Sequence, residues 1–385
     1  MSAYRGTWWA IAAAALVVSA CKDGTAPQLS NPQQLGSDVQ TVASVFDSPA
    51  FQSFGALDSA PGSPVAASAP AGALLGATRV APPQTARLAY ADAPTRLQAF
   101  RTAASALVRP SLSAQVIPAA VWGKAYVWDV GTHQYIEDAN QFDANRHGVR
   151  LILYAVDPIT HHIVESPLTP VGYVDLLDES AGNTNQLHVI VKDGTPPNGT
   201  TYVDYTVSGT AIGTPPSAFS ATALGFLTDG TRRIDFNATF SATNLTTDNP
   251  DAQADVHWAL DTPALTIDLH EKLETPDANN ATITIDFTYT HGTATVQLTG
   301  TVTVVVSPPS VTADLAVYVD GNSTAFAVVR GTNDTDHNGI TITHQDGSQL
   351  TAAEWEALAQ LYDLPDRLEE SLEHLFHPAE HFMGI

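Results

Sequence analysis

Residues 281–306, ATITIDFTYTHGTATVQLTGTVTVVV, decide the fold class of this chain. Apolar and polar residues alternate along both halves, with Ile283, Ile285 and Phe287 on one face and threonines on the other. A period of two is typical of a strand that buries one face. The pair His291-Gly292 separates the two halves and predicts a two-residue hairpin turn.

Folding about this turn predicts which residues face one another across the two strands. The predicted pairs are Tyr289–Ala294, Phe287–Val296 and Ile285–Leu298 on the apolar face, with Thr288–Thr295 and Thr284–Thr299 on the polar face. Both faces are self-consistent, and a slip of one residue would reverse every side chain. The stretch therefore favours an antiparallel hairpin with one buried and one exposed face.

The same alternation extends over residues 113–332, with turn signals at Asp193-Gly194, Asp229-Gly230, Pro263 and Asp320-Gly321. About a dozen strands follow one another through short links, so we expect an antiparallel arrangement. Arms of about ten residues exceed the usual strand length of about five or six. The fold class expected is mainly β, a large antiparallel meander that forms a curved sheet or open barrel. Two consecutive sandwich domains are the alternative.

Segments of different texture flank this predicted β domain. Residues 21–112 are rich in Ala, Pro and Ser, and they indicate a tether, most flexible over 58–93. Helical spacing of apolar residues predicts short helices over 37–46 and 94–108 that dock on the main domain. In the loop and helices expected over 333–385, Thr351 and Glu354 form a capping box. The helix that begins there has an apolar stripe of Trp355, Leu358, Leu361 and Tyr362, and a second predicted helix ends before Pro378. Both predicted helices would cover the apolar side of the sheet.

Charge excludes some classes of partner. The chain has 16 Lys and Arg against 40 Asp and Glu, for a formal net charge of −24. Such a chain repels phosphate backbones, so no nucleic acid is expected among its partners. An anionic membrane surface would also repel it.

The first 21 residues carry a signal for export. Arg5 precedes an apolar run over 8–18, which is too short to span a bilayer and fits the core of a signal peptide. The run ends in Val18-Ser19-Ala20-Cys21, and Cys21 is the single cysteine of the chain. This ending resembles the lipobox of bacterial lipoproteins. The resemblance implies that residues 1–20 are cleaved, that the Cys21 thiol is lipidated and that the protein is exported.

The predicted location follows from this resemblance. It implies a lipid-anchored protein of the bacterial cell envelope, with the membrane as partner through Cys21. Lys22, the residue after the cysteine, favours the outer membrane under the sorting rule of enteric lipoproteins. Because no second cysteine exists, packing alone must hold the mature chain together.

One segment has the spacing of a cation loop. Asp334, Asp336 and Asn338 precede Gly339 at positions one, three, five and six of an EF-hand pattern. Gln345 stands where the bidentate glutamate would be, and a strand rather than a helix is expected before the segment. The three residues are therefore a weak calcium candidate, with an ordinary polar turn as the alternative. No other cofactor is predicted.

The sequence contains no recognisable catalytic motif. There is no Gly-x-Ser-x-Gly elbow, phosphate loop or His-Glu-x-x-His zinc motif. We expect a non-catalytic lipoprotein with a structural or binding role. Its expected shape resembles that of lipid-carrying periplasmic lipoproteins, whose open half-barrels have a helical lid, so the apolar face could hold an apolar small molecule or lipid, or be a packed core. Alternatives are an envelope-polymer hydrolase with loop carboxylates and a transmembrane barrel.

Overall fold

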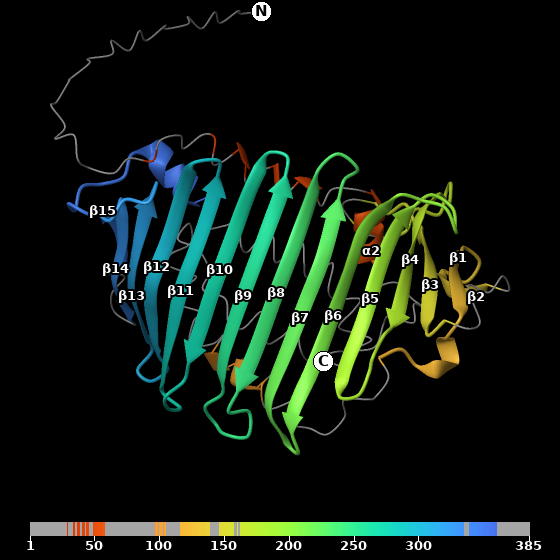
Figure 1. Cartoon of the computed structure of the whole chain (residues 1–385), viewed down its shortest axis with the longest axis horizontal. Coiled ribbons are helices and arrows are strands. Elements are labelled where there is room, and N and C mark those ends of the chain that lie inside the picture. Colours follow the sequence, from red (N-terminus) through yellow and green to blue (C-terminus); the bar gives the residue numbers. More distant parts are fainter. Residues whose placement is uncertain are drawn as a thin grey trace, which may run out of the picture.

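The computed structural model is built around one large β-sheet (Figure 1). It describes residues 29, 34, 37–38, 41–42, 44–45, 49–57, 97–98, 100–102, 104, 116–138, 146–157, 160, 162–334 and 339–359. Cys21, the interval 58–93 and the second C-terminal helix predicted from the sequence lie outside these residues.

The described residues form fifteen strands in a single sheet. The strands are β1 (Lys124–Asp129), β2 (Gln134–Asp138), β3 (Gly148–Tyr154), β4 (Pro170–Asp178), β5 (Thr184–Asp193), β6 (Thr201–Gly213), β7 (Pro216–Thr228), β8 (Arg233–Thr243), β9 (Asp251–Asp261), β10 (Ala264–Glu274), β11 (Asn280–His291), β12 (Ala294–Val305), β13 (Ser310–Val319), β14 (Ala327–Asp334) and β15 (Thr341–His344). Helix α2 (Pro49–Gly55) and the 3-10 helix η3 (Ala119–Val121) precede the sheet.

The order of the strands confirms the predicted meander. From β15 to β3 each strand pairs with its neighbours in sequence, and every one of these pairs is antiparallel. The sheet is open, with β15 at one edge and β2 at the other, and Figure 1 shows both ends bending away from the viewer. Two sandwich domains were the wrong alternative, because one continuous sheet holds all the described strands.

Two features of the sheet differ from the expectation. The pair β1·β3 is parallel, because the β1·β2 hairpin turns back and the chain then passes to the other side of β1. The sheet also continues beyond residue 332 into β15, which pairs with β14 over Thr341–His344. Four residues are too few for a clear period of two, so the sequence pattern did not predict this edge strand.

The hairpin over 281–306 is confirmed, but its predicted register is wrong by two residues. Tyr289 pairs with Val296 and not with Ala294, and Phe287 pairs with Leu298. The turn residues are Gly292 and Thr293, and Gly292 has φ +60° as the first central residue. Glycine in that position fits a type II′ turn. A shift of two residues keeps every side chain on its predicted face, so the alternation alone could not reveal the error.

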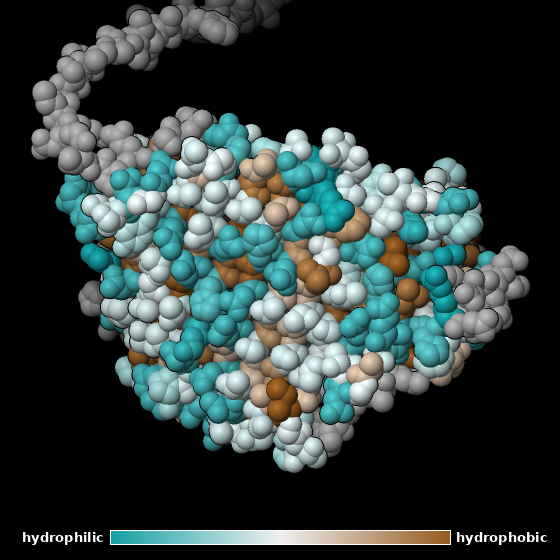
Figure 2. Space-filling model, in the orientation of Figure 1, coloured by the Kyte–Doolittle hydropathy of each residue, from teal (hydrophilic) through white to brown (hydrophobic). Residues whose placement is uncertain are grey.

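The two faces of the sheet have different environments. Alternate residues along the long strands are buried, among them Phe236, Trp258, Phe287 and Leu298. These side chains form one hydrophobic core together with residues of the N-terminal and C-terminal helical segments. Figure 2 shows the opposite face, which hydrophilic and intermediate side chains cover over most of its area. Burial of the apolar face is the main stabilising contribution to the fold.

The docking predicted for the N-terminal helices is confirmed where they are described. Val42, Val45, Leu97 and Phe100 are fully buried in the same core as the sheet residues. Helix α2, which the sequence analysis did not predict, contacts β3, β4, β5 and β6. In Figure 1 helix α2 lies behind the sheet, on the side away from its polar face.

The C-terminal capping box is also confirmed. Thr351 Oγ1 accepts a hydrogen bond from the Glu354 backbone N–H at 3.3 Å, and Glu354 Oε2 accepts one from the Thr351 N–H at 2.8 Å. Residues 352–359 are helical, and Leu358 is buried. Trp355 was expected in the same apolar stripe but is 40% exposed. Helical spacing placed it there, but the buried side of the helix passes through Ala357, Leu358 and Ala359 instead.

Candidate functional site

The polar face carries a cluster that the sequence analysis did not single out. The triplets Asp255-Val256-His257 on β9 and Asp268-Leu269-His270 on β10 have the same Asp-x-His pattern. The two strands are antiparallel about the Thr262-Pro263 turn, so His257 faces Asp268 and His270 faces Asp255. Both triplets are equally distant from the predicted turn, and this symmetry is the signal that could have revealed the cluster.

Each histidine forms a close pair with the aspartate opposite. His257 Nδ1 lies 2.6 Å from Asp268 Oδ1, and His270 Nδ1 lies 2.5 Å from Asp255 Oδ1. An ionised carboxylate only accepts hydrogen bonds, so each Nδ1 carries the proton. In the described part of the chain nothing bonds to either Nε2 atom. When the ring is neutral, Nε2 therefore offers an acceptor lone pair to a ligand.

These pairs lie in a hollow of about 310 Å³ on the polar face. Four neighbouring strands, β8 to β11, supply its polar lining: Asn237, Thr239, Asp255, His257, Asp268, His270, Asp286 and Thr288. Among the described residues, no lysine or arginine lines this hollow. With neutral imidazoles it carries three carboxylates and no positive charge. It therefore favours ligands with hydroxyl or cationic groups.

Hydrogen bonds shape the charge of this hollow. Partial burial raises the pKa of Asp255, but hydrogen bonds from His270, Gln253 and Thr239 outweigh it and lower the pKa below its usual value. Asp286 Oδ1 accepts a hydrogen bond from Gln297 Nε2 at 2.9 Å. Asp255 thus stays ionised and holds the His270 ring in one orientation.

The hollow is not a built metal centre. Within the described ranges, no three or more His, Cys, Asp or Glu side chains are placed to hold one ion. The two imidazoles and the carboxylates pair with each other across the strands instead. The chemistry available is hydrogen bonding from a preorganised polar surface.

A second polar cluster lies on the opposite, buried side of the sheet. The Asp38 side chain is 2% exposed and receives hydrogen bonds from Tyr289 Oη at 2.5 Å and His291 Nδ1 at 2.6 Å, both on Oδ2. Gln34 Nε2 donates to Oδ1 at 2.8 Å. Burial raises the pKa of the Tyr289 hydroxyl, and the hydrogen bond to Asp38 raises it further. This cluster fastens the N-terminal segment to the end of β11.

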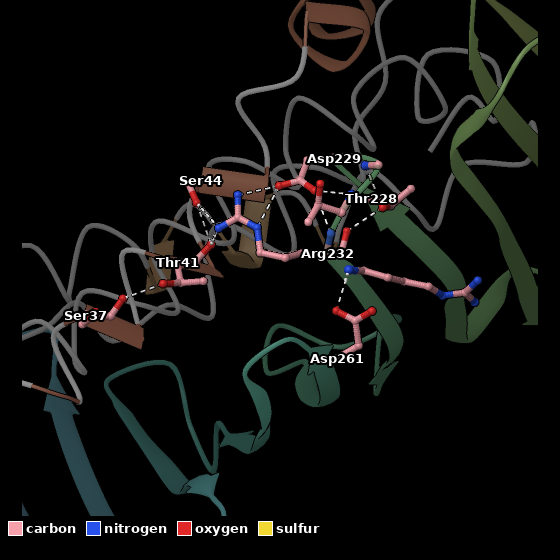
Figure 3. A network of polar contacts seen from close by, with 10 residues as sticks. Ser37, Thr41, Ser44, Thr228, Asp229, Arg232 and Asp261 are labelled. Atoms are coloured by element: carbon pink, nitrogen blue, oxygen red, sulfur yellow. Dashed lines mark hydrogen bonds and ion pairs between the residues drawn. The ribbon is translucent and has the colours of Figure 1, made fainter.

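A third cluster fastens the same segment to the β7–β8 turn (Figure 3). Arg232 Nη1 donates to Ser44 Oγ at 2.9 Å and to the Thr41 carbonyl at 3.4 Å. Its other nitrogens bind Asp229, at 2.8 Å from Nε and 2.5 Å from Nη2. A cation beside the carbonyl groups at the end of a helix is favourable. Both networks fasten the N-terminal segment to the sheet and stabilise the fold, and the Arg232 network is partly exposed.

The predicted site residues are placed as follows. Asp334 ends β14 and is exposed, so the strand expected before the calcium candidate is confirmed. Asp336 and Asn338 lie outside the described residues, as does the predicted lipidation site Cys21. In the portion of the chain that the structure covers, no helix has the length and apolar composition needed to cross a bilayer.

Comparison with protein families, curated proteins and solved structures found no match to this chain.

Proposed function

We propose that this chain is an exported lipoprotein of the bacterial cell envelope, anchored in the outer membrane through acylated Cys21. Its sheet serves as a non-catalytic body with a structural or binding role. The polar face of the sheet, with the hollow at β8 to β11, is the surface that meets a ligand.

The lipobox is the observation that carries this proposal. Val18-Ser19-Ala20-Cys21 follows the apolar run directly and contains the single cysteine of the chain. The first described residue, Leu29, already packs against the core, so the proposed anchor lies just before the folded body.

The packing of the apolar face supports the proposal that a ligand binds at the polar face. Residues of the N-terminal segment, such as Val45 and Phe54, share one core with strand residues such as Phe236 and Tyr289. Side chains of the chain itself therefore occupy the surface that an apolar ligand would need. The hollow, in contrast, is open to solvent and lined by groups that hydrogen-bond.

The state of the loop carboxylates supports a non-catalytic role. Asp129, Asp157, Asp229, Asp277 and Asp346 each accept a hydrogen bond from a backbone N–H two or three residues later. Aspartates in this arrangement stabilise turns. A hydrolase with loop carboxylates would instead need a pair of carboxyl groups open to the substrate.

Metabolic labelling tests the anchor. The full chain is expressed in a bacterium with an alkyne fatty acid, next to Cys21→Ser and, as a matched control, Lys22→Ala. We expect label and an acyl mass increase on the native chain and on Lys22→Ala, and neither on Cys21→Ser. Label that persists on Cys21→Ser, or a native chain without label, contradicts the proposal.

A second experiment addresses the hydrolase alternative. The chain beginning at Lys22 is incubated with isolated cell-wall sacculi, and soluble fragments and sedimented protein are measured. We expect no release of fragments over time. Release that disappears in Asp268→Asn but persists in Asp248→Asn, an exposed aspartate outside the hollow, would replace the binding role with a catalytic one.

A further inference from the structure

The N-terminal segment follows one rim of the sheet. Asp38 binds Tyr289 and His291 at the end of β11, and Thr41 and Ser44 bind Arg232 between β7 and β8. Helix α2 then contacts β3 to β6. In Figure 1 the helical pieces of this segment lie along the upper ends of the strands. The turns β7–β8, β9–β10 and β11–β12 form this rim, which we name the anchored rim.

The opposite rim is fastened to a different segment. Arg101 donates hydrogen bonds to the carbonyl groups of Asp277 and Ala278 in the β10–β11 turn. Strand β8 has 11 residues, so the two rims lie ~36 Å apart at about 3.3 Å per residue. If the strands stand upright on a membrane, the two rims therefore differ in their distance from the membrane surface by about this length.

The distance along the chain from Cys21 to the folded body is short. Leu29 packs against the core, and it lies eight residues after Cys21 (29 − 21 = 8). Eight residues span at most ~29 Å when fully extended. Gln34, which binds Asp38, is already helical. Among the described residues after the proposed anchor, Asp38 hydrogen-bonds to the sheet, and these bonds lie at the anchored rim.

We propose that the anchored rim faces the bilayer and that the opposite rim points away from it. This inference rests on the proposed acylation of Cys21. The sheet then stands on the membrane with its strands upright, and the hollow on the polar face opens sideways. The partner of this rim is a lipid headgroup surface.

Charge at the anchored rim indicates which headgroups fit. Arg232 is paired with Asp229, and Arg233 with Asp235, while Asp320 in the β13–β14 turn at the same end of the strands adds a negative charge. Among the described residues this rim has no cluster of unpaired cations, so anionic lipids would not attract it. A zwitterionic surface fits best, with the acyl anchor providing the attachment.

Energy transfer to the membrane surface tests the orientation. Because Cys21 is acylated, an introduced cysteine is the single thiol available for a donor dye. Thr293→Cys labels the β11–β12 turn of the anchored rim, and the matched variant Thr246→Cys labels the opposite rim; both threonines are exposed. The acylated chains are bound to phosphatidylcholine vesicles that contain an acceptor-labelled lipid.

We expect several-fold higher transfer efficiency from position 293 than from position 246. Thr288→Cys, within β11 and three residues before its end, should give a value between them. Equal transfer from both rims, or higher transfer from position 246, overturns the orientation while the acylation stands. Flotation of the vesicles is measured first. A chain that does not float with them contradicts the anchor itself, and with it the orientation.

Discussion

Replacing Asp38 with alanine removes the contact that holds the N-terminal segment on β11. Its carboxyl group receives three hydrogen bonds while 2% exposed, and hydrogen bonds to a charged group contribute about 1.5–3 kcal/mol each. Breaking a buried polar pair costs about 3–5 kcal/mol because the partner is left unsatisfied. The His291 ring is 28% exposed, so water can replace part of its bond. We therefore expect Asp38→Ala to lower the free energy of unfolding by about 3 kcal/mol, the lower end of that range.

Urea unfolding of the chain from Lys22, followed by tryptophan fluorescence, measures this loss. A denaturant slope near 3 kcal/mol/M would move the midpoint by about 1 M. Asp248→Ala is the control, because this aspartate is exposed in the β8–β9 turn, and we expect a change within about 0.5 kcal/mol.

A double-mutant cycle measures the interaction energy between Asp38 and Tyr289 separately from the other effects of each substitution. Tyr289→Phe removes the hydroxyl that donates to Asp38 and leaves the ring in the core. We expect a coupling of about 1–2 kcal/mol between the two substitutions. A loss below about 0.5 kcal/mol for Asp38→Ala, or no coupling with Tyr289→Phe, would refute the reasoning that this carboxyl fastens the segment to the sheet.

Three further predictions concern the sheet and its turns. Gly300→Ala would place a Cβ atom 2.2 Å from the Asp314 carbonyl oxygen, so we expect the free energy of unfolding to fall by more than about 2 kcal/mol. For Gly292→Ala, whose Cβ meets nothing within 4 Å, we expect a fall of about 1 kcal/mol. Equal unfolding midpoints of the two variants in urea would contradict this prediction. Burial raises the pKa of Asp229, but its hydrogen bonds lower it below the usual value overall, so its stabilisation is present above about pH 4 and is lost as the pH falls further. Asp229→Asn should therefore flatten the acid side of the pH–stability curve, and an unchanged acid slope would count against this prediction. His257→Gln should change the unfolding free energy by less than about 0.5 kcal/mol, since both partners of its pair are half exposed, and a larger loss in thermal unfolding would mark the cluster as structural.

Local patterns were sufficient to predict the strands and their faces. The alternation over 281–306 assigned Phe287 and Tyr289 to the buried side, where the structure places them. It did not determine the register, because Gly292 can occupy either central position of a two-residue turn. The parallel β1·β3 pair was missed for a related reason, since the connection between β2 and β3 has no pattern that indicates its direction.

The polar clusters depend on contacts between distant parts of the chain. Asp38 and Tyr289 are separated by 251 positions, so no motif spacing could bring them together. The Asp-x-His pairs could in principle have been predicted from the sequence, because the Thr262-Pro263 turn brings residue 255 opposite residue 270 and residue 257 opposite residue 268. The hollow itself could not have been predicted from the sequence, since it depends on side chains from four strands.

Hydrogen exchange of the acylated chain tests the central claim most directly: that the N-terminal segment closes the apolar face of the sheet beside the proposed anchor. Peptides from residues 37–57 should be protected as strongly as peptides from β8 to β11, since Val42, Val45 and Phe54 share the core of those strands. Exchange of 37–57 at the rate of an unstructured chain, while β8 to β11 stay protected, would contradict the account.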